Sequence, residues 1–363
     1  MTGTQPYTDS PRAIMHLDLD AFFCAVEVLR DPSLKGKPIV VGGKSENRGV
    51  VAAASYPARK FGIHSAMPMI EASRRCKDLI IISSKHGMYR MYSKVIMGIL
   101  KAESPVIQQV SIDEAYLDLS DEINEWVEST DIARRIQLRI SRDIGLSASV
   151  GIATNKMIAK IASDYRKPNG LTVVSPGTEV DFLSPLAVKK IPGIGPKTNE
   201  RLAKLGIYTV ADMAVIPDER LIKRFGKLGE AMVRWSKGID ERPVHEERET
   251  KSISTERTFS KNIADQEALL AILEKLSNKV GEQLRKKGFM AATIQIKMRY
   301  GDFSTFTRQH TVSDPMDDGR EIYEVARKLF VTNWIPGEPV RLLGVGGSHF
   351  NEPRGQMSLD LGP

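Results

Sequence analysis

The chain has 363 residues, too long for one ordinary hydrophobic core, so we expect two to four compact units. With 41% hydrophobic residues, 27% charged residues and no apolar run near the roughly 18 residues of a membrane helix, the composition excludes a membrane-spanning protein. The polar N-terminal stretch lacks a secretory signal, and the two cysteines form no ligand-spaced cluster, so a cytoplasmic protein is expected. The net charge of +7 suits a polyanionic partner, but it also suits basic faces that are simply solvated.

The first 170 residues mix strand and helix patterns, which predicts an α/β segment. The stretch SIDE separates two short apolar runs, which is the arrangement of a tight hairpin. Expected strands are 15–23 (MHLDLDAFF), 38–43, 49–55, 106–110, 115–120 and 147–154, and expected helices are 88–103 and 131–143.

From residue 175 to 242 the strand patterns disappear, and short helical pieces alternate with Gly and Pro, which predicts a small helical domain. The polar, charged stretch PVHEERETKSIS (243–254) is typical of a linker. After it we expect a small α+β domain with strands 252–259, 291–300, 303–312 and 340–347 and helices 264–287 and 316–332.

Acidic residues occur in two of the expected strands of the first domain. A hairpin turn at SIDE can direct Asp113 and Glu114 to one place, and pairing of the HLDLD strand beside it brings Asp18 close. Three carboxylates repel one another unless divalent cations neutralise them, and oxygen ligands favour Mg²⁺, with Mn²⁺ as a possible substitute. Two such ions could stabilise the attacking and leaving oxygens of phosphoryl transfer, although acids flanking strands are also common on surfaces.

Two further stretches place cations where they could bind phosphates. Tyr56 and Arg59 are three residues apart, so on a helical turn they share a face, and Lys167 precedes a Pro-Asn-Gly turn. An arginine, a phenol and a lysine could hold a triphosphate. Taken singly, each fits an ordinary exposed side chain better than a phosphate contact.

The stretch IPGIGPKT lies between expected helices and has the pattern of a helix-hairpin-helix element. Gly193 and Gly195 allow backbone N–H groups to approach a DNA phosphate, and Lys197 follows them. In the last domain Lys297 and Arg299 alternate with apolar residues, giving one sheet face a basic character that suits a phosphate backbone or plain solvent.

Five stretches, in order along the chain, resemble the motifs of the Y-family DNA polymerases of the DinB class. They are HLDLDAFFCAVE, SYPARKFGIHSAMP, SIDEAYLDLS, SVGIATNKMIAKIASDYRKPNG and IPGIGPKT. The resemblance covers nearly the whole chain. It implies an α+β multidomain, right-hand fold with palm (12–30 and 86–174), fingers (31–85), thumb (175–243, helix-hairpin-helix at 191–207), linker (244–251), little finger (252–350) and a disordered tail (351–363).

The resemblance also implies roles for individual residues. Asp18, Asp113 and Glu114 would be the catalytic, metal-holding carboxylates, with a metal contact from the Leu19 carbonyl. The incoming nucleotide would be contacted by Phe22, Phe23, Tyr56, Arg59 and Lys167, with Phe23 as the steric gate against a ribose 2′-hydroxyl. Asp20 inherits no catalytic role and is expected to pack or to form local hydrogen bonds.

The end of the sequence resembles the peptide by which bacterial polymerases bind the sliding clamp. Gln356, Leu359 and Leu361 would fill a pocket on that partner. The expected substrates are primer-template DNA and deoxynucleoside triphosphates, used by a monomer in low-fidelity translesion synthesis for DNA repair and damage tolerance.

Two other functions would use some of the same features. A metal-dependent nuclease also uses acidic clusters and helix-hairpin-helix elements, but it needs neither the triphosphate residues nor Phe23. A DNA-binding module without catalysis would not need Asp18, Asp113 and Glu114 together.

Overall fold

The structure is a computed structural model that describes residues 11–245 and 249–351. The described chain forms two compact units. Residues 11–42, 51–67 and 72–245 make up the first, and residues 43–50, 68–71 and 249–351 make up the second. Within these described ranges no helix is both long and apolar enough to cross a membrane.

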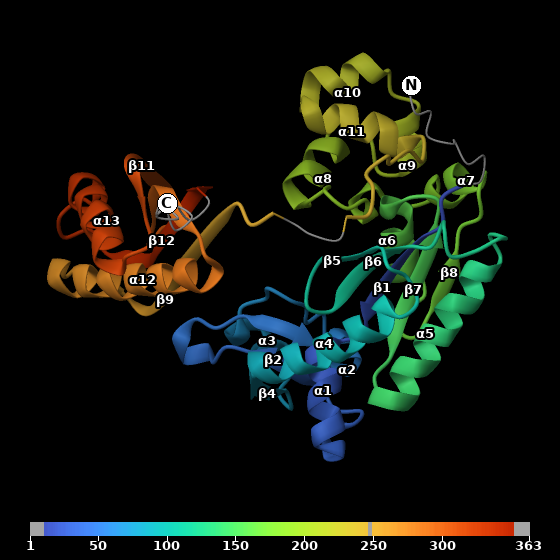
Figure 1. Cartoon of the computed structure of the whole chain (residues 1–363), viewed down its shortest axis with the longest axis horizontal. Coiled ribbons are helices and arrows are strands. Elements are labelled where there is room, and N and C mark those ends of the chain that lie inside the picture. Colours follow the sequence, from blue (N-terminus) through green and yellow to red (C-terminus); the bar gives the residue numbers. More distant parts are fainter. Residues whose placement is uncertain (1–10, 246–248, 352–363) are drawn as a thin grey trace, which may run out of the picture. The chain divides into compact units, whose positions relative to one another are not determined.

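The centre of the first unit is a five-stranded sheet with the order β5-β6-β1-β7-β8 (Figure 1). Neighbouring strands are antiparallel except β7 and β8, which are parallel. The strands are β1 (Ile14–Leu19), β5 (Ile107–Gln109), β6 (Glu114–Asp118), β7 (Ala148–Ala153) and β8 (Leu171–Val173). The sheet therefore combines an N-terminal strand with a segment that starts almost ninety residues later, as the two-part palm expectation requires.

Alternation along β1 sorts its side chains between two layers. Met15 and Leu17 belong to a core that also contains residues of α4 (His86–Lys101) and α5 (Glu128–Ile144). Ile14 belongs to a second core with residues of α6 (Lys156–Tyr165). His16 and Asp18 have the parity of Ile14, so the sheet directs them to the α6 layer.

The expected strand 15–23 is too long, because β1 ends at Leu19. Ala21 has a left-handed backbone with φ 46°, which breaks the strand, and α1 (Phe22–Arg30) begins immediately after it. Phe22 is buried and Phe23 is partly buried at the start of that helix. The apolar run of the sequence crosses a strand-to-helix boundary that its hydrophobicity does not reveal.

Residues 39–83 contain a three-stranded sheet in the range expected for the fingers. Its order is β3-β2-β4, formed by β2 (Ile39–Gly42), β3 (Val51–Ala54) and β4 (Ile80–Ser83). Two short helices, α2 (Tyr56–Arg59) and α3 (Met69–Arg75), complete this part. The sequence indicated β2 and β3 but not β4 or α3.

The short helices expected between residues 175 and 242 are present, as part of the first unit. They are α7 (Glu179–Leu183), α8 (Pro196–Ala203), α9 (Val210–Ala214), α10 (Asp218–Phe225) and α11 (Lys227–Ser236). Their apolar residues share the second core with α6, so these helices and the α6 layer of the sheet are packed as one body.

The second unit contains the expected α+β domain, an antiparallel sheet of order β11-β10-β12-β9 with two helices. Its elements are β9 (Ser252–Ile263), α12 (Gln266–Lys287), β10 (Met290–Tyr300), β11 (Thr305–Met316), α13 (Gly319–Asn333) and β12 (Val340–Asn351) (Figure 1). The expectation that a helix begins at Met316 is wrong. Met316 ends β11, and the Asp318 side chain caps α13 by accepting hydrogen bonds from the N–H groups of Arg320 and Glu321.

Candidate active site

The paired strands β1 and β6 bring the acidic residues together. Asp18 lies directly opposite Glu114 in the antiparallel register, and the Leu19 N–H donates to the Asp113 carbonyl oxygen at 3.0 Å. Directly opposed residues have Cβ atoms about 5 Å apart. The hairpin at SIDE and the approach of the HLDLD strand are thus both confirmed.

The three carboxylate side chains nevertheless point to separate partners. Asp18 pairs with Lys167 at 2.9 Å, Glu114 pairs with Lys160, and Asp113 accepts a short hydrogen bond from the Ser111 hydroxyl. Across the described chain no three His, Cys, Asp or Glu side chains are gathered as a ready-made metal site. The expected convergence therefore holds for the backbone, while like-charge repulsion and two nearby ammonium groups draw the side chains apart.

The two opposed carboxyl groups differ in their electrostatics. Burial raises the pKa of Asp18, the Lys167 ammonium opposes this, and the charges of Asp113 and Glu114 raise it further. Hydrogen bonds from His16 and Lys160 lower the pKa of Glu114 to about 2, against the effect of burial. Asp18 is thus the carboxylate whose charge is the more costly, and a closer cation would relieve that cost.

His16 and Lys160 belong to this site, although the sequence analysis did not identify them. His16 is fully buried, which lowers its pKa to about 4 and leaves it neutral near pH 7; its Nε2 lies 3.3 Å from Glu114 Oε2 and its Nδ1 2.8 Å from Ser163 Oγ. Lys160 and Ser163 come from α6, a helix that was also missed. Its signals were present in the Asn155 cap and the apolar residues that follow it.

Asp20 forms hydrogen bonds, as expected, but its partners are distant in the sequence and the bonds connect three parts of the site. Its buried carboxylate accepts from the Tyr56 hydroxyl at 3.0 Å, from the Ser149 hydroxyl at 2.8 Å and from the Asn169 N–H at 2.8 Å. Asn169 follows Lys167 by two residues. Asp20 therefore links the strand that carries Asp18 to the candidate triphosphate residues from two other segments.

Tyr56 and Arg59 share one face, as predicted from their spacing. The Arg59 guanidinium lies over the Tyr56 ring at 4.7 Å, and its Nε donates to the Ala54 carbonyl oxygen at 3.0 Å. Arg59 is exposed, and its terminal nitrogens have no protein partner in the part of the chain that the structure describes. A stacked, anchored guanidinium with free donors is suited to bind a phosphate oxygen.

The expected helix-hairpin-helix element is a turn with buried isoleucines and exposed glycines. Ile191 and Ile194 are buried, while Gly193, Gly195 and Lys197 are exposed. Gly193 has φ 103°, and a Cβ at this position would lie 3.1 Å from the Trp235 ring. Gly195 caps α8, which begins with Pro196, so the first N–H group that the helix offers is that of Lys197.

A cavity of about 760 Å³ connects this turn with Asp18. Its wall contains Asp18, Lys160, Lys167, Gly193 and Gly195, together with Lys189 and Lys190. Arg201, on α8 after the turn, has protein partners of its own: its Nη2 donates to the Arg224 carbonyl at 2.7 Å, and its guanidinium stacks on Phe225.

In the second unit Lys297 and Arg299 lie on the partly exposed face of β10, as predicted. Lys297 pairs with Glu256 at 2.7 Å, and Arg299 Nε donates to Thr305 at 2.7 Å. Gln356, Leu359 and Leu361 lie outside the described residues.

The donor set of the first unit fits a hard divalent cation. Carboxylates on facing strands, an adjacent turn carboxylate and backbone carbonyls are all oxygen donors, the type that Mg²⁺ prefers. Lys160 lies beside Glu114 and Lys167 beside Asp18, so positive charge is already favourable at these two carboxylates.

Comparison with protein families assigns most of the chain. Residues 17–164 match the impB/mucB/samB family, residues 189–240 the thumb domain of DNA polymerase iota, and residues 250–361 the C-terminal domain of the impB/mucB/samB family. Curated relatives named DNA polymerase IV include those of Dehalococcoides mccartyi strain CBDB1 (45% identity over 97% of this chain and 90% of the relative) and Streptococcus pneumoniae strain D39 (40%, 93% and 96%).

Solved structures give the same result. A Y-family DNA polymerase chimera of Dbh and Dpo4 has a TM-score of 0.84 at 30% identity, covering 94% of this chain and 99% of its own. An insertion ternary complex of Dbh DNA polymerase has a TM-score of 0.67 at 30% identity, with the same coverage.

Proposed function

This chain belongs to the Y-family DNA polymerases, in the DNA polymerase IV group, and is a DNA-directed DNA polymerase; we propose that it extends primers across damaged templates with low fidelity. In the proposed reaction the primer 3′-hydroxyl attacks the α-phosphate of a deoxynucleoside triphosphate, and pyrophosphate leaves. This activity would serve DNA repair and damage tolerance.

The observation that carries the proposal is the register of β1 against β6. It puts Asp18 opposite Glu114 and bonds Leu19 to the turn residue Asp113. We infer that the three carboxylates and the Leu19 carbonyl hold two Mg²⁺ ions, for which Mn²⁺ could substitute. Such ions, when bound, stabilise the charge on the attacking and leaving oxygens.

The residues around the carboxylates would bind and orient the nucleotide. Arg59 offers free guanidinium donors, and the Tyr56 ring stacks beneath them. Lys167 pairs with Asp18, and its ammonium group would pair with a phosphate of the bound nucleotide instead. Phe22 and Phe23 begin α1 next to the end of β1, and the partly buried Phe23 ring would face the sugar as the steric gate.

The cavity beside the carboxylates supports a path for the primer strand. It runs from Asp18 to the exposed Gly193 and Gly195, whose backbone, with Lys197, would bind primer phosphates independently of sequence. Lys297 and Arg299 would add phosphate contacts from the second unit.

Three further expectations remain part of the proposal. The C-terminal residues Gln356, Leu359 and Leu361 would bind the sliding clamp, the chain would act as a monomer, and it would work in the cytoplasm. Deleting the residues after Arg354 should leave distributive synthesis intact and remove stimulation by the clamp. Unchanged stimulation would contradict the clamp role.

The polymerase proposal is tested with an end-labelled primer on undamaged and abasic templates, with Mg²⁺ and Mn²⁺ compared. Lengthening of the primer across the lesion is expected, together with release of one pyrophosphate per nucleotide added. Shortening of the primer would favour the nuclease alternative, and DNA binding without any change in length would favour the non-catalytic binding module.

A further inference from the structure

Behind the Phe23 ring lies a second aromatic ring that the sequence analysis did not identify. Phe23 stacks on Tyr89 with ring centroids 4.2 Å apart and an interplanar angle of 13°. Tyr89 comes from the first turn of α4 and is completely buried. His86, the first residue of α4, meets the edges of both rings. The exposed side of Phe23 is therefore presented on a rigid aromatic base.

Tyr89 is in turn fixed by a buried carboxylate. Its hydroxyl donates to Glu27 Oε1 at 2.8 Å, and only 4% of Glu27 is exposed. Burial and this hydrogen bond raise the pKa of Tyr89 to about 12, so the phenol remains a donor. A phenol that donates to an ionised carboxylate forms a stronger bond than a neutral pair does.

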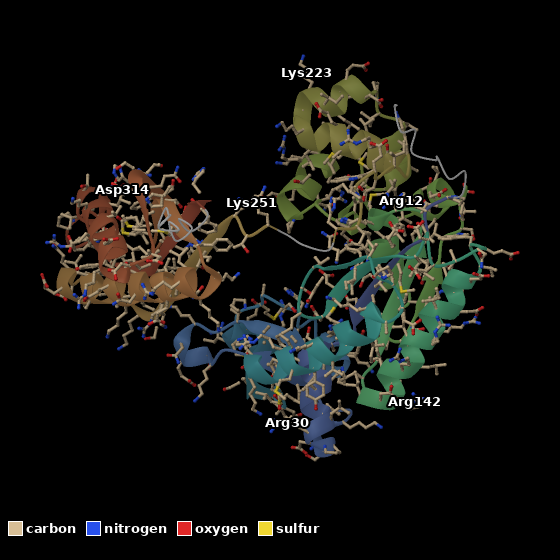
Figure 2. The ribbon with its side chains drawn as sticks, viewed as in Figure 1. Arg12, Arg30, Arg142, Lys223, Lys251 and Asp314 are labelled. Atoms are coloured by element: carbon tan, nitrogen blue, oxygen red, sulfur yellow. The ribbon has the colours of Figure 1, made fainter. Side chains whose placement is uncertain are left out.

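The second oxygen of Glu27 is held from two sides. Lys85 Nζ lies 3.1 Å and Arg30 Nη1 3.3 Å from Oε2. Arg30 ends α1 and is labelled in Figure 2. Because burying a carboxylate is costly unless it is paired and hydrogen-bonded, these two cations offset that cost and hold the Glu27 side chain in place.

Glu27 and Phe23 are four residues apart on α1, so they lie on the same face of one helix. The contacts form a closed ring: Phe23 stacks on Tyr89, Tyr89 bonds to Glu27, and Glu27 returns to the helix that carries Phe23. We propose that Glu27, through Tyr89, is a positioning residue that fixes the Phe23 ring and thereby sharpens the choice of deoxyribose over ribose. The proposal rests on the steric-gate role proposed for Phe23.

The choice between the two sugars depends on how far the Phe23 ring can move away from the nucleotide. A ribose differs from a deoxyribose by one hydroxyl group, so a ring that tilts or recedes by the size of an oxygen atom admits both sugars. Without its hydroxyl bond, the Tyr89 ring keeps its stacking partner but loses the contact that sets its position along α1. Phe23 then has a base that can move with it.

The test compares Tyr89→Phe and Glu27→Gln with wild type in single-nucleotide incorporation. The quantity measured is the ratio of kcat/KM for a deoxynucleotide to kcat/KM for the matching ribonucleotide. We expect each variant to lower this ratio about tenfold, which corresponds to about 1.4 kcal/mol. The double variant should lower it no further than either single variant, because both changes break the same bond.

Tyr92→Phe is the matched control. Tyr92 lies on the same helix and is partly buried, and within the described part of the chain its hydroxyl has no protein partner. Its removal should leave the ratio unchanged. A general loss of stability would lower kcat/KM for both nucleotides together, so the ratio separates positioning from folding.

Phe23→Ala distinguishes failure of this inference from failure of the gate itself. If Phe23→Ala admits ribonucleotides while folded Tyr89→Phe keeps the wild-type ratio, the positioning role is wrong and the gate stands. If Phe23→Ala also keeps the wild-type ratio, the gate assignment fails and the inference fails with it. Should Glu27→Gln not fold, the conservative Tyr89→Phe decides.

Discussion

Replacing Asp20 by asparagine separates the candidate triphosphate residues from the catalytic strand at little steric cost. The carboxylate accepts hydrogen bonds from Tyr56 and Ser149 on Oδ1 and from the Asn169 N–H on Oδ2. An amide has one acceptor oxygen, so it can keep the first pair of bonds or the last one.

The magnitude follows from the bond that is lost. If the amide oxygen stays with Tyr56 and Ser149, its NH₂ group faces the N–H of Asn169, and this part-buried donor loses its acceptor. That costs about 1–3 kcal/mol. The turn after Lys167 should loosen, and the KM for the incoming nucleotide should rise about tenfold, which is about 1.4 kcal/mol of lost binding. The turnover number should change less.

Steady-state incorporation of a single nucleotide measures this, with chemical denaturation alongside. Asp118→Asn is the matched control, because its carboxylate serves the nearby Ser120 and Arg12 rather than a candidate nucleotide residue. Its KM should equal that of wild type. A wild-type KM for Asp20→Asn would refute the idea that Asp20 positions the triphosphate residues.

Three further changes have defined outcomes. Lys160→Met removes the ammonium group beside Glu114, a charge that bound Mg²⁺ could also neutralise. The melting temperature should therefore fall more in EDTA than in Mg²⁺. An equal fall in both would contradict the view that Lys160 and Mg²⁺ can each neutralise Glu114. Arg135 and Arg139 hold the pKa of Glu103 below its ordinary value of 4.5. The ionised carboxylate therefore stabilises the fold above that pH, and the stabilisation is lost on acidification. In acid titrations of Glu103→Gln, the free energy of unfolding should decline less below about pH 4.5 than in wild type, by about 1 kcal/mol. Gly193→Ala forces φ 103° on a residue with a Cβ and should cost about 1–3 kcal/mol and weaken DNA binding in anisotropy titrations, whereas wild-type values for both would exclude a strained turn.

The helices and strands that could be predicted are those whose pattern of apolar and polar residues repeats within the segment itself. Alternation in HLDL and AYLDL indicated two strands, and the short turn at SIDE indicated the antiparallel pairing of β5 with β6. The boundary between β1 and α1 was not predictable in this way. It depends on a left-handed backbone at Ala21, while the apolar run continues through Phe22 and Phe23.

The site shows a similar division between local and distant information. The acidic pairs and the Tyr56–Arg59 face follow from spacing. The partners of the carboxylates do not, because Lys160 comes from α6 and lies 46 positions from Glu114. Asp20 and Glu27 were equally hidden: their function depends on Asn169 and Tyr89, which only the tertiary packing brings near.

The central claim is that the carboxylates brought together by β1 and β6 perform nucleotide transfer. Asp113→Asn tests it most directly, because this residue is in the turn and its loss leaves the strand pairing intact. Primer extension in Mg²⁺ should fall to background, while affinity for primer-template DNA, measured by fluorescence anisotropy, stays near that of wild type. Extension at the wild-type rate would contradict the claim.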